Sequence, residues 1–566
     1  MQIKNLQYYG TLFLWTVCFF SFSEDKSTNF SKPMNLSFSL AGSFGEPRPD
    51  HFHSGIDIKT NGVEGEPVFS IYDGYISRIK VSSVGYGKAL YITHPNGYTS
   101  LYAHLGRFSD AIEKYVHGQH YARKQSEFDL YPDAEMFKVR QNDTIAFSGN
   151  TGGSTAPHLH FEIRDSKTEH ALNPLDFYPK DFYTDTIPPQ LNKVKIYKFK
   201  SRFYEAQTEV LQLKRSESFL TTDTQIIVDN YDFFCLSLEG FDKQDTSENK
   251  NGIYRMEVLK NNAVIFRYTM DDVDFDKTRM CNAFVDYHEM MNDSGYFYNA
   301  YLLKNNTLRI YQSDNGLIEL KNNDTAEIVI YCYDYKENKT GIRLTVIRND
   351  SGNLTEHKDV AGSMLTDKKD SVRLNGFKMI FPEKCFYDDV SLSVSRTAQP
   401  ENWLSAVYSV SHPGTYIPLQ KSARIEFNAT VKKQRGKITL VRRDMDGKET
   451  ALPTKYTKTR FYAESKKLGA FFLSYDTTKP EVKILYSGTE ISNNTIIQVK
   501  ISDDLSGIGT YNGYIDNTWV NFYYDSKNDI LQYQPDEYCQ KGEHILKIIV
   551  TDKVGNMNTI TQKFNY

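Results

Sequence analysis

Polar and apolar residues alternate through residues 156–164, which read Ala-Pro-His-Leu-His-Phe-Glu-Ile-Arg. Successive side chains of a β-strand point to opposite faces, so this period of two predicts a strand with one polar and one apolar face. The polar face is expected to be exposed and carries His158, His160, Glu162 and Arg164. The three apolar residues between them are expected in the core.

Similar alternation predicts further strands earlier in the chain. One is expected at 35–44, and two hairpins are predicted, 68–81 around Asp73-Gly74 and 89–104 around Asn96-Gly97. In the last of these strands His104 shares a face with Ser100 and Tyr102, which repeats the polar alternation of residues 158–164.

Residues 110–136 interrupt this strand pattern with a polar, aromatic stretch, and a helix followed by a loop is predicted there as an insert. Strand signals return at 137–139 and 144–147. The first folded unit is then complete by about residue 180.

Two echoes organise the rest of the chain. Asp185-Thr186-Ile187-Pro188 leads into strand-like sequence, and Asp476-Thr477-Thr478-Lys479-Pro480 does so again. A turn-rich segment also precedes a strand pattern twice, at 333–339 and at 551–556. Each pair is expected to mark the first strand and the last hairpin of one β-sandwich, and chance similarity in a chain rich in Tyr, Asn and Asp is the alternative.

These patterns predict an all-β dominated, multidomain chain, in which a small antiparallel β-sheet domain is followed by about three β-sandwich domains of Ig-like type. The expected bounds are 1–23 for a signal peptide, 33–180 for the β-sheet domain with its insert at 110–136, 186–348 for the first sandwich, 349–371 for a linker, 372–475 for a second β-domain and 476–566 for the last sandwich.

Composition narrows the function. The 566 residues carry a formal net charge of −4, which gives no general attraction to nucleic acid or to an anionic membrane surface. The 40 Tyr and 35 Phe favour strands over helices. Beyond Cys18, five cysteines lie outside the histidine-rich part of the chain, where buried free thiols and some pairing are both open.

The N-terminus has the pattern of a secretory signal. Lys4 precedes an apolar run from Leu12 to Phe22, and Ser21-Phe22-Ser23 offers a small-x-small cleavage site. The alternative is an uncleaved anchor, which would then be the only membrane association. The protein is therefore expected to cross the inner membrane and to work in the periplasm or cell envelope.

Five side chains could form a metal-dependent site: His53, Asp57, His104, His158 and His160. Catalytic zinc is held by three protein ligands and keeps its fourth position open, and two histidines with one aspartate fit that count. His160 as the third ligand would leave His104 and His158 free to take a proton from water and to hydrogen-bond an oxyanion. Surface histidines without metal, a core role for His104 and a turn-capping Asp57 are the alternatives.

The motifs around these residues are similar to those of the lysostaphin/LytM-type zinc metalloendopeptidases. They are His53-Ser54-Gly55-Ile56-Asp57, Tyr102-Ala103-His104-Leu105, and Gly149-Asn150-Thr151-Gly152 leading to 158–162. The resemblance implies Zn²⁺ on His53, Asp57 and His160, catalytic roles for His104 and His158, and hydrolysis of peptide cross-links in bacterial peptidoglycan. Ligands are missing in the relatives that activate other hydrolases without cutting, whereas all three are present here.

Two departures from the family pattern stand out. A Tyr that some members carry before the first ligand is replaced by residues 46–50, Glu-Pro-Arg-Pro-Asp, and the insert at 110–136 is longer than in compact members. The insert is expected to wall the substrate groove. Glu162 could orient a ligand, with a plain cross-strand salt bridge as the alternative.

The expected partners are the stem peptides and cross-links of peptidoglycan and, through the C-terminal β-domains, an envelope protein. Two other functions are kept as alternatives: a non-cleaving LytM-type scaffold that activates another cell-wall hydrolase, and a surface adhesion or assembly protein. The four remaining histidines before residue 121 are expected on surfaces or loops, namely His51, His94, His117 and His120.

Overall fold

The computed structural model describes residues 29–200, 202–312, 314–350, 363–398, 404–431, 433–485 and 490–566. The predicted signal peptide and residues 351–362 of the predicted linker lie outside this described part. Strands dominate the described chain, as expected from the sequence. No helix in the described residues is long and apolar enough to span a membrane.

One antiparallel sheet is the main sheet of the N-terminal domain, and in it β13 lies between β4 and β8. In pairing order its main strands are β1 (Leu40–Gly42), β4 (Ile56–Lys59), β13 (His158–Asp165), β8 (Tyr98–Leu105), β7 (Lys88–Thr93), β6 (Gly74–Val81) and β10 (Phe128–Leu130). His160 is directly opposite Asp57 on β4 and opposite Ala103 on β8. Residues opposite each other in an antiparallel pair share a face, so this register places His160 and Asp57 side by side.

The hairpin predicted at 89–104 is present as β7 and β8, but the one predicted at 68–81 is wrong. Residues 67–69 form β5, which leaves the main sheet and pairs with β12 (Thr144–Phe147) in a separate sheet completed by β9 (Arg107–Phe108). At Asp73-Gly74 the chain therefore passes from the sheet of β5 to the sheet of β6 and does not form a hairpin between them. The strand expected at 35–44 is reduced to the three residues of β1.

The polar face of β13 is buried, contrary to the expectation of an exposed face. Glu162 has 0% exposure and Arg164 has 5%. The apolar face packs into the core as predicted, where Phe161 contacts Tyr102. Both faces of this strand can be buried because the polar side chains on one face form hydrogen bonds with one another, as described below.

The insert forms a helix, α1 (Asp110–Arg123), with Ile112, Val116 and His120 on its buried side. The part predicted as a loop includes β10, which extends the main sheet by pairing with β6. The segment that follows contains β11 (Lys138–Val139).

Two sheets pack together in each of the three later β-rich regions. The first region has β16 (Gln207–Gln212), β15 (Gln190–Phe199), β20 (Phe233–Gln244), β21 (Ser247–Asn251) and β25 (Phe297–Asn299) in one sheet, and β17 (Lys214–Ser216), β18 (Phe219–Thr221), β19 (Ile226–Ile227), β27 (Lys339–Ile347), β26 (Thr325–Tyr333), β22 (Arg255–Lys260) and β23 (Ala263–Thr269) in the other. A short pair, β14 (Ala171–Leu172) with β24 (Asp272–Val273), joins it to the N-terminal domain.

The second region has β29 (Asp370–Leu374), β30 (Phe377–Phe381), β34 (Ala423–Asn428), β38 (Arg460–Ser465) and β37 (Lys455–Tyr456) facing β32 (Ser393–Thr397), β33 (Val407–Ser411), β39 (Gly469–Tyr475), β35 (Ile438–Arg443) and β36 (Glu449–Leu452). The last has β40 (Glu481–Ile484), β41 (Ile497–Ser502), β45 (Ile530–Tyr533) and β44 (Tyr523–Asp525) facing β43 (Thr518–Val520), β42 (Ile508–Ile515), β46 (Glu543–Asp552) and β47 (Met557–Asn565). The hairpins β26–β27 and β46–β47 are the two expected from the sequence echo.

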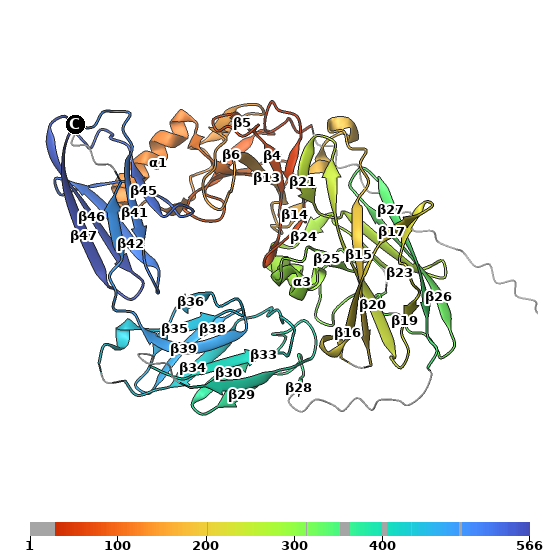
Figure 1. Cartoon of the computed structure of the whole chain (residues 1–566). Coiled ribbons are helices and arrows are strands. Elements are labelled where there is room, and N and C mark those ends of the chain that lie inside the picture. The colour runs from red at the N-terminus through yellow and green to blue at the C-terminus, as the bar shows by residue number, and fades with distance from the viewer. Residues whose placement is uncertain are drawn as a thin grey trace, which may run out of the picture.

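The chain closes into a ring, because its last β-region returns to the N-terminal domain beside α1 (Figure 1). Tyr121 on α1 stacks on Tyr538 with ring centroids 3.6 Å apart, and its hydroxyl donates to Asp536. Lys527 Nζ donates to the carbonyl of Asn150 across 2.5 Å. Segments about four hundred positions apart in sequence therefore meet next to the histidine cluster.

We expect Tyr121→Ala to open this ring without unfolding either end, because the stacked ring and its hydroxyl bond are the main aromatic contact between α1 and residues 536–538. Small-angle X-ray scattering should show a larger radius of gyration, and amide exchange should rise at 536–538. Lys114→Ala, an exposed change on the same helix, is the control. Equal scattering curves for the two variants would contradict the ring contact.

Candidate metal centre

Three side chains converge on one point of the main sheet. His53 Nε2 lies 3.0 Å from Asp57 Oδ1 and 3.0 Å from His160 Nδ1, and the last two atoms are 2.9 Å apart. All three side chains are buried. Two imidazole nitrogens and a carboxylate oxygen are ligands that zinc prefers, and they are close enough for one ion to contact all three.

The backbone brings these three side chains together from two strands and a loop. Asp57 lies on β4 and His160 opposite it on β13, whereas His53 precedes β4 in the turn expected from Ser54-Gly55. Gly55 has no alternative at this turn, because a Cβ there would lie 2.3 Å from the carbonyl oxygen of Phe161.

Each histidine is anchored through one ring nitrogen, which leaves the other directed at the cluster. His53 Nδ1 donates to the carbonyl of Ser43 across 2.7 Å, and His160 Nε2 donates to Glu162 Oε1 across 2.8 Å. A hydrogen bond at one nitrogen fixes the ring tautomer and orientation, and so makes the other nitrogen available to a metal.

Glu162 supports His160 as one of the two sequence interpretations expected, and its ion pair is with Arg164 on its own strand and not across strands. Its Oε1 also accepts from Ser54 Oγ at 2.6 Å and from Tyr86 OH at 2.5 Å, while its Oε2 accepts from Arg164 Nε at 2.7 Å. It therefore orients His160 and forms a buried ion pair with Arg164. Burial raises the pKa of Glu162, but Arg164 and His160 outweigh burial and hold the carboxyl well below its usual range.

His104 and His158 stand next to the three converging residues, with their rings 4.9 Å apart. His104 Nδ1 donates to the carbonyl of Thr151 at 2.8 Å, and His158 Nδ1 donates to that of Ala156 at 2.8 Å. His158 Nε2 lies 3.4 Å from Asp57 Oδ1. All five residues predicted for the site are thus brought together.

The route by which His104 reaches the cluster differs from the simple alternation expected for residues 98–104. Ala103 is opposite His160, so regular alternation would send His104 to the other face, where Tyr102 packs against Phe161. His104 instead has φ of 58°, and the pairing of β7 with β8 shifts register here. This irregularity turns the imidazole back to 5.8 Å from the His160 ring.

Burial and neighbouring groups shift the pKa values of several residues in the cluster. It lowers the pKa of His53 to about 4 and that of His104, with help from the two neighbouring histidines, to about 3. Burial also raises the pKa of Asp57, but His53 and hydrogen bonds from His158 and His160 hold it well below its usual value. At neutral pH His53 and His104 are therefore neutral, whereas Asp57 is ionised.

Several site residues had no signal in the sequence analysis. Arg48 Nη2 donates to Asp57 Oδ2 at 2.9 Å from the segment where the family Tyr is absent, and burial raises the pKa of nearby Glu46 to about 7. A Cβ on Gly42 would lie 2.6 Å from Arg48 Nη2 and 2.8 Å from Asp57 Oδ2. Tyr86, Arg48, Glu46 and Gly42 reach the site only through the tertiary fold. The residues next to them in the sequence do not indicate this position.

Of the four other histidines, His94 lies in the loop between β7 and β8 as predicted, although it is buried, whereas the prediction for His120 is wrong because it is buried on α1. His94 is 3% exposed and bonds to the carbonyl of Asp73 and to Ser100, while His120 is 6% exposed and bonds to the carbonyl of Gln125. They are satisfied core histidines. His51 is exposed, and His117 is half-buried against Glu537.

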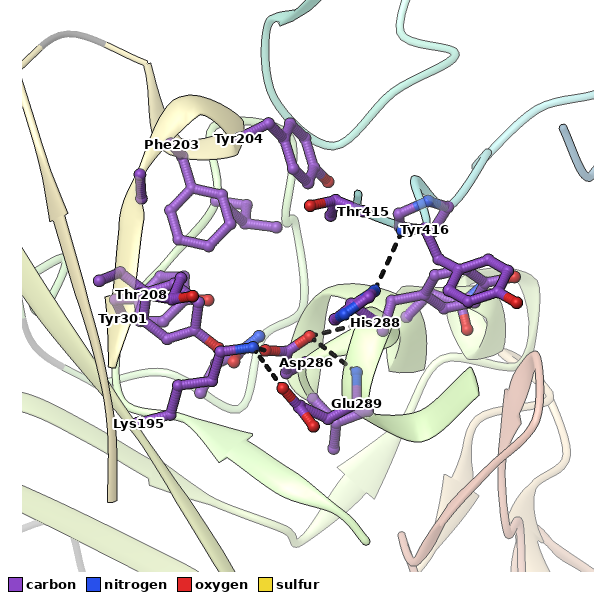
Figure 2. Close-up of a pocket in the computed structure, with 18 of the residues that line it drawn as sticks. Lys195, Phe203, Tyr204, Thr208, Asp286, His288, Glu289, Tyr301, Thr415 and Tyr416 are labelled. Carbon is purple, nitrogen blue, oxygen red and sulfur yellow. Dashed lines mark hydrogen bonds and ion pairs between the residues drawn. The ribbon is translucent and has the colours of Figure 1, made fainter. Parts of the chain in front are cut away.

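A second polar hollow lies away from the five candidate site residues, between the first two sandwich regions (Figure 2). This cavity of about 150 Å³ contains Lys195, whose Nζ donates to Asp286 at 2.6 Å and to Glu289 at 2.7 Å. The positive charge of Lys195 is therefore neutralised by Asp286 and Glu289, so this hollow is a poor candidate for binding an anion.

Comparison with known proteins gives the class of the N-terminal domain. Residues 51–126 match Peptidase family M23, and residues 362–476 match a Zu5-like domain. The DD-carboxypeptidase/endopeptidase Mpg of Neisseria meningitidis is 38% identical over 112 residues, which is 20% of either chain. An uncharacterized metalloprotease of Haemophilus influenzae is 31% identical over 123 residues, 22% of this chain and 20% of its own.

The catalytic domain of lysostaphin from Staphylococcus simulans is 25% identical, covering 24% of this chain and 87% of that one with a TM-score of 0.18. The chain spans about a fifth of the length of the first relatives above. The match of residues 51–126 to Peptidase family M23 confirms the expected resemblance of the N-terminal part. This supports a metallopeptidase.

We expect Glu162→Gln to weaken zinc binding by about 10- to 100-fold, because an amide cannot accept from His160, Ser54 and Arg164 with the same charge. Competition with a chromophoric chelator measures the affinity. Glu169→Gln is the matched control, since Glu169 meets Arg164 only at the surface, across 3.5 Å. Equal zinc affinities in the two variants would contradict a positioning role for Glu162.

Proposed function

We propose that the protein is an exported zinc metalloendopeptidase that hydrolyses peptide cross-links of bacterial peptidoglycan. The observation that carries this proposal is the convergence of His53, Asp57 and His160 within 3.0 Å, with His104 and His158 beside them. We assign the first three as metal ligands and the last two as catalytic residues.

The donor set fits zinc. Its two nitrogens and one oxygen are held in place before any ion arrives, and Arg48 occupies the second carboxylate oxygen of Asp57 so that one oxygen remains for the ion. When bound, zinc would supply Lewis-acid activation of water and of the amide carbonyl. Binding would also displace the proton from His160, whose pKa is lowered by burial but raised on balance to about 9 by its bonds to Asp57 and Glu162.

His104 and His158 are the residues that we propose transfer protons during hydrolysis. Both donate through Nδ1 to backbone carbonyls, which leaves Nε2 of each ring to exchange a proton with water. Once protonated, the same atom can donate to the oxygen that gains charge as the amide is attacked. The positive φ of His104 is a strain that this task would explain.

The proposed substrate follows from the relatives and from the groove beside the site. The Neisseria relative is named a DD-carboxypeptidase/endopeptidase, which supports a peptide of the cell wall as substrate. A groove of about 530 Å³ runs between loop 150–155 and residues 523–532, and it presents Glu64, Asp525 and Lys527. Charges of both signs suit stem peptides, which carry free carboxylates and amines.

The remaining assignments rest on the sequence. We propose export from the basic and apolar pattern before Ser23, and placement in the periplasm or envelope. The domain bounds are also proposed, with three sandwich-type regions that hold the peptidase in the ring and could contact an envelope partner.

We expect His160→Ala to lose zinc and all hydrolysis, whereas His158→Ala should keep zinc and lose turnover by at least about 100-fold, because only the former removes a ligand. Zinc content measures the first effect, and mass spectrometry of muropeptides released from purified sacculi measures the second. His51→Ala is the control, because that exposed ring bonds only to the carbonyl of Pro49.

Two outcomes separate the alternatives. Zinc binding without release of muropeptides by the wild type, together with stimulation of a separate hydrolase, would favour the non-cleaving scaffold. Equal muropeptide release by wild type and His160→Ala would refute the proposed enzyme.

The groove yields a separate prediction. Lys527→Ala removes a cation that binds the Asn150 carbonyl across the ring, and we expect KM for a purified cross-linked muropeptide to rise several-fold with little change in kcat. Steady-state kinetics on that muropeptide test this. Lys541→Ala, on the same region but away from the groove, is the control. A loss confined to kcat would place Lys527 outside substrate binding.

A further inference from the structure

Three buried aspartates meet at the joint between the peptidase domain and the first sandwich. Asp185 lies in the connecting segment, Asp242 near the end of β20 and Asp334 just after β26. One oxygen from each lies within 4.8 Å of the other two. Their exposed fractions are 5%, 6% and 1%.

No lysine or arginine forms an ion pair with these three carboxylates among the described residues. Asp334 accepts from the backbone and side-chain nitrogens of Asn338, at 2.9 and 2.8 Å, and Asp185 Oδ1 accepts from the Ile187 amide at 3.1 Å. Asp242 Oδ1 is buried and has no hydrogen-bond partner. Burying an ionised carboxylate without a partner costs free energy of folding, and a bound cation would offset that cost.

A small cavity beside Asp242 adds a second unpaired oxygen. Asn251, which is opposite Asp242 in the pairing of β20 and β21, also has a buried Oδ1 without a partner. Both residues line a cavity of about 30 Å³, which is room for one water-sized occupant. Two oxygens without partners and the space for an occupant thus lie on the Asp242 side of the aspartate cluster.

The arrangement recurs in the last sandwich. Asp476, Asp503 and Asp552 also bring one oxygen each within 4.8 Å, and Asp503 Oδ1 is again buried without a partner. Asn556 Nδ2 joins Asp552 Oδ2 at 2.6 Å to the Asp476 carbonyl at 3.1 Å. In the same way, Asn338 Nδ2 joins Asp334 to the Asp185 carbonyl, at 2.8 and 2.9 Å. Each trio takes one aspartate from the segment that enters its sandwich.

We propose that Asp185, Asp242 and Asp334 bind a calcium ion that stiffens the joint between the peptidase domain and the first sandwich. Three carboxylates provide only oxygen ligands, which suits a hard cation and not zinc. Calcium accepts an irregular oxygen set, whereas magnesium demands near-ideal octahedral geometry and retains water.

Without the ion, burial and the two neighbouring carboxylates raise the pKa of Asp242 to about 9. At neutral pH this carboxyl is therefore protonated in the ion-free protein, and a bound dication would displace that proton.

The joint is directly linked to the candidate zinc centre. Gln244, two residues after Asp242, accepts from the backbone amide of Leu40 at 2.9 Å, and β1 pairs with the β4 strand that carries Asp57. Calcium at the joint would hold the sandwich against the edge of the peptidase sheet. It would act on the orientation of the domain and not on the reacting atoms.

Calcium titration of the full-length mature chain tests the proposal, after removal of metal with a chelator and reloading of zinc. Calorimetry counts the bound Ca²⁺, and Tb³⁺ luminescence sensitised by tyrosine reports a nearby site. We expect Asp242→Asn to bind one Ca²⁺ fewer than wild type. Asp223→Asn is the matched control, since its exposed carboxylate in the same sandwich pairs with Lys214.

Thermal unfolding separates ion binding from a structural role. In chelator, Asp242→Asn should melt at or above the wild-type temperature, because it removes a buried carboxylate. In saturating Ca²⁺ the wild type should melt about 5 °C higher than in chelator, and the variant should gain less. The order of the two proteins should therefore reverse.

Two results would overturn the proposal: no saturable Ca²⁺ binding by the wild type, or the same Ca²⁺ count in wild type and Asp242→Asn. Stabilisation by Mg²⁺ equal to that by Ca²⁺ would refute the choice of ion. His160→Ala keeps all three aspartates, so it should bind Ca²⁺ like wild type even when zinc is lost. Failure of the calcium site is thereby distinct from failure of the peptidase.

Discussion

The site depends on the antiparallel register of β13 with β4. That register places His160 opposite Asp57 and so makes a two-residue contact out of positions 103 apart in the chain. A shift by one residue would turn His160 and Glu162 into the apolar core. Such a shift would also carry the charges of Glu162 and Arg164, which lie on the same strand, into the apolar core, and this cost opposes it.

Close approach around this pairing limits the residues that can occupy neighbouring positions. Gly55 allows the backbone to pass the Phe161 carbonyl, and Gly42 leaves space for Arg48 beside Asp57. His104 tolerates a left-handed backbone in a register irregularity, which brings a fourth ring to the cluster. The site thus uses local strain that the surrounding sheet is rigid enough to hold.

The sequence was sufficient for the parts that depend on local pattern. Alternation predicted β13, Asn96-Gly97 predicted the β7–β8 turn, and the three motifs brought together the five site residues. Alternation also predicted an exposed polar face for β13 and a regular strand at His104, and both predictions are wrong. The burial of β13 and the backbone turn at His104 depend on the strands that pair with them, which alternation does not identify. Asp73-Gly74 shows the same limit, since a turn signal does not state which sheet the next strand joins.

The ring explains why a small peptidase domain carries so long a C-terminal part. Lys527 and Tyr121 connect the last sandwich to the loop and the helix that flank the histidines, so the groove has one wall from each end of the chain. Such a wall keeps a defined shape only if the intervening joints are stiff. Each echoed Asp-Thr segment enters a sandwich at such a joint and supplies a buried carboxylate there. The repeated motif and the closed ring are therefore two aspects of one constraint, the fixed placement of the groove beside the histidine cluster.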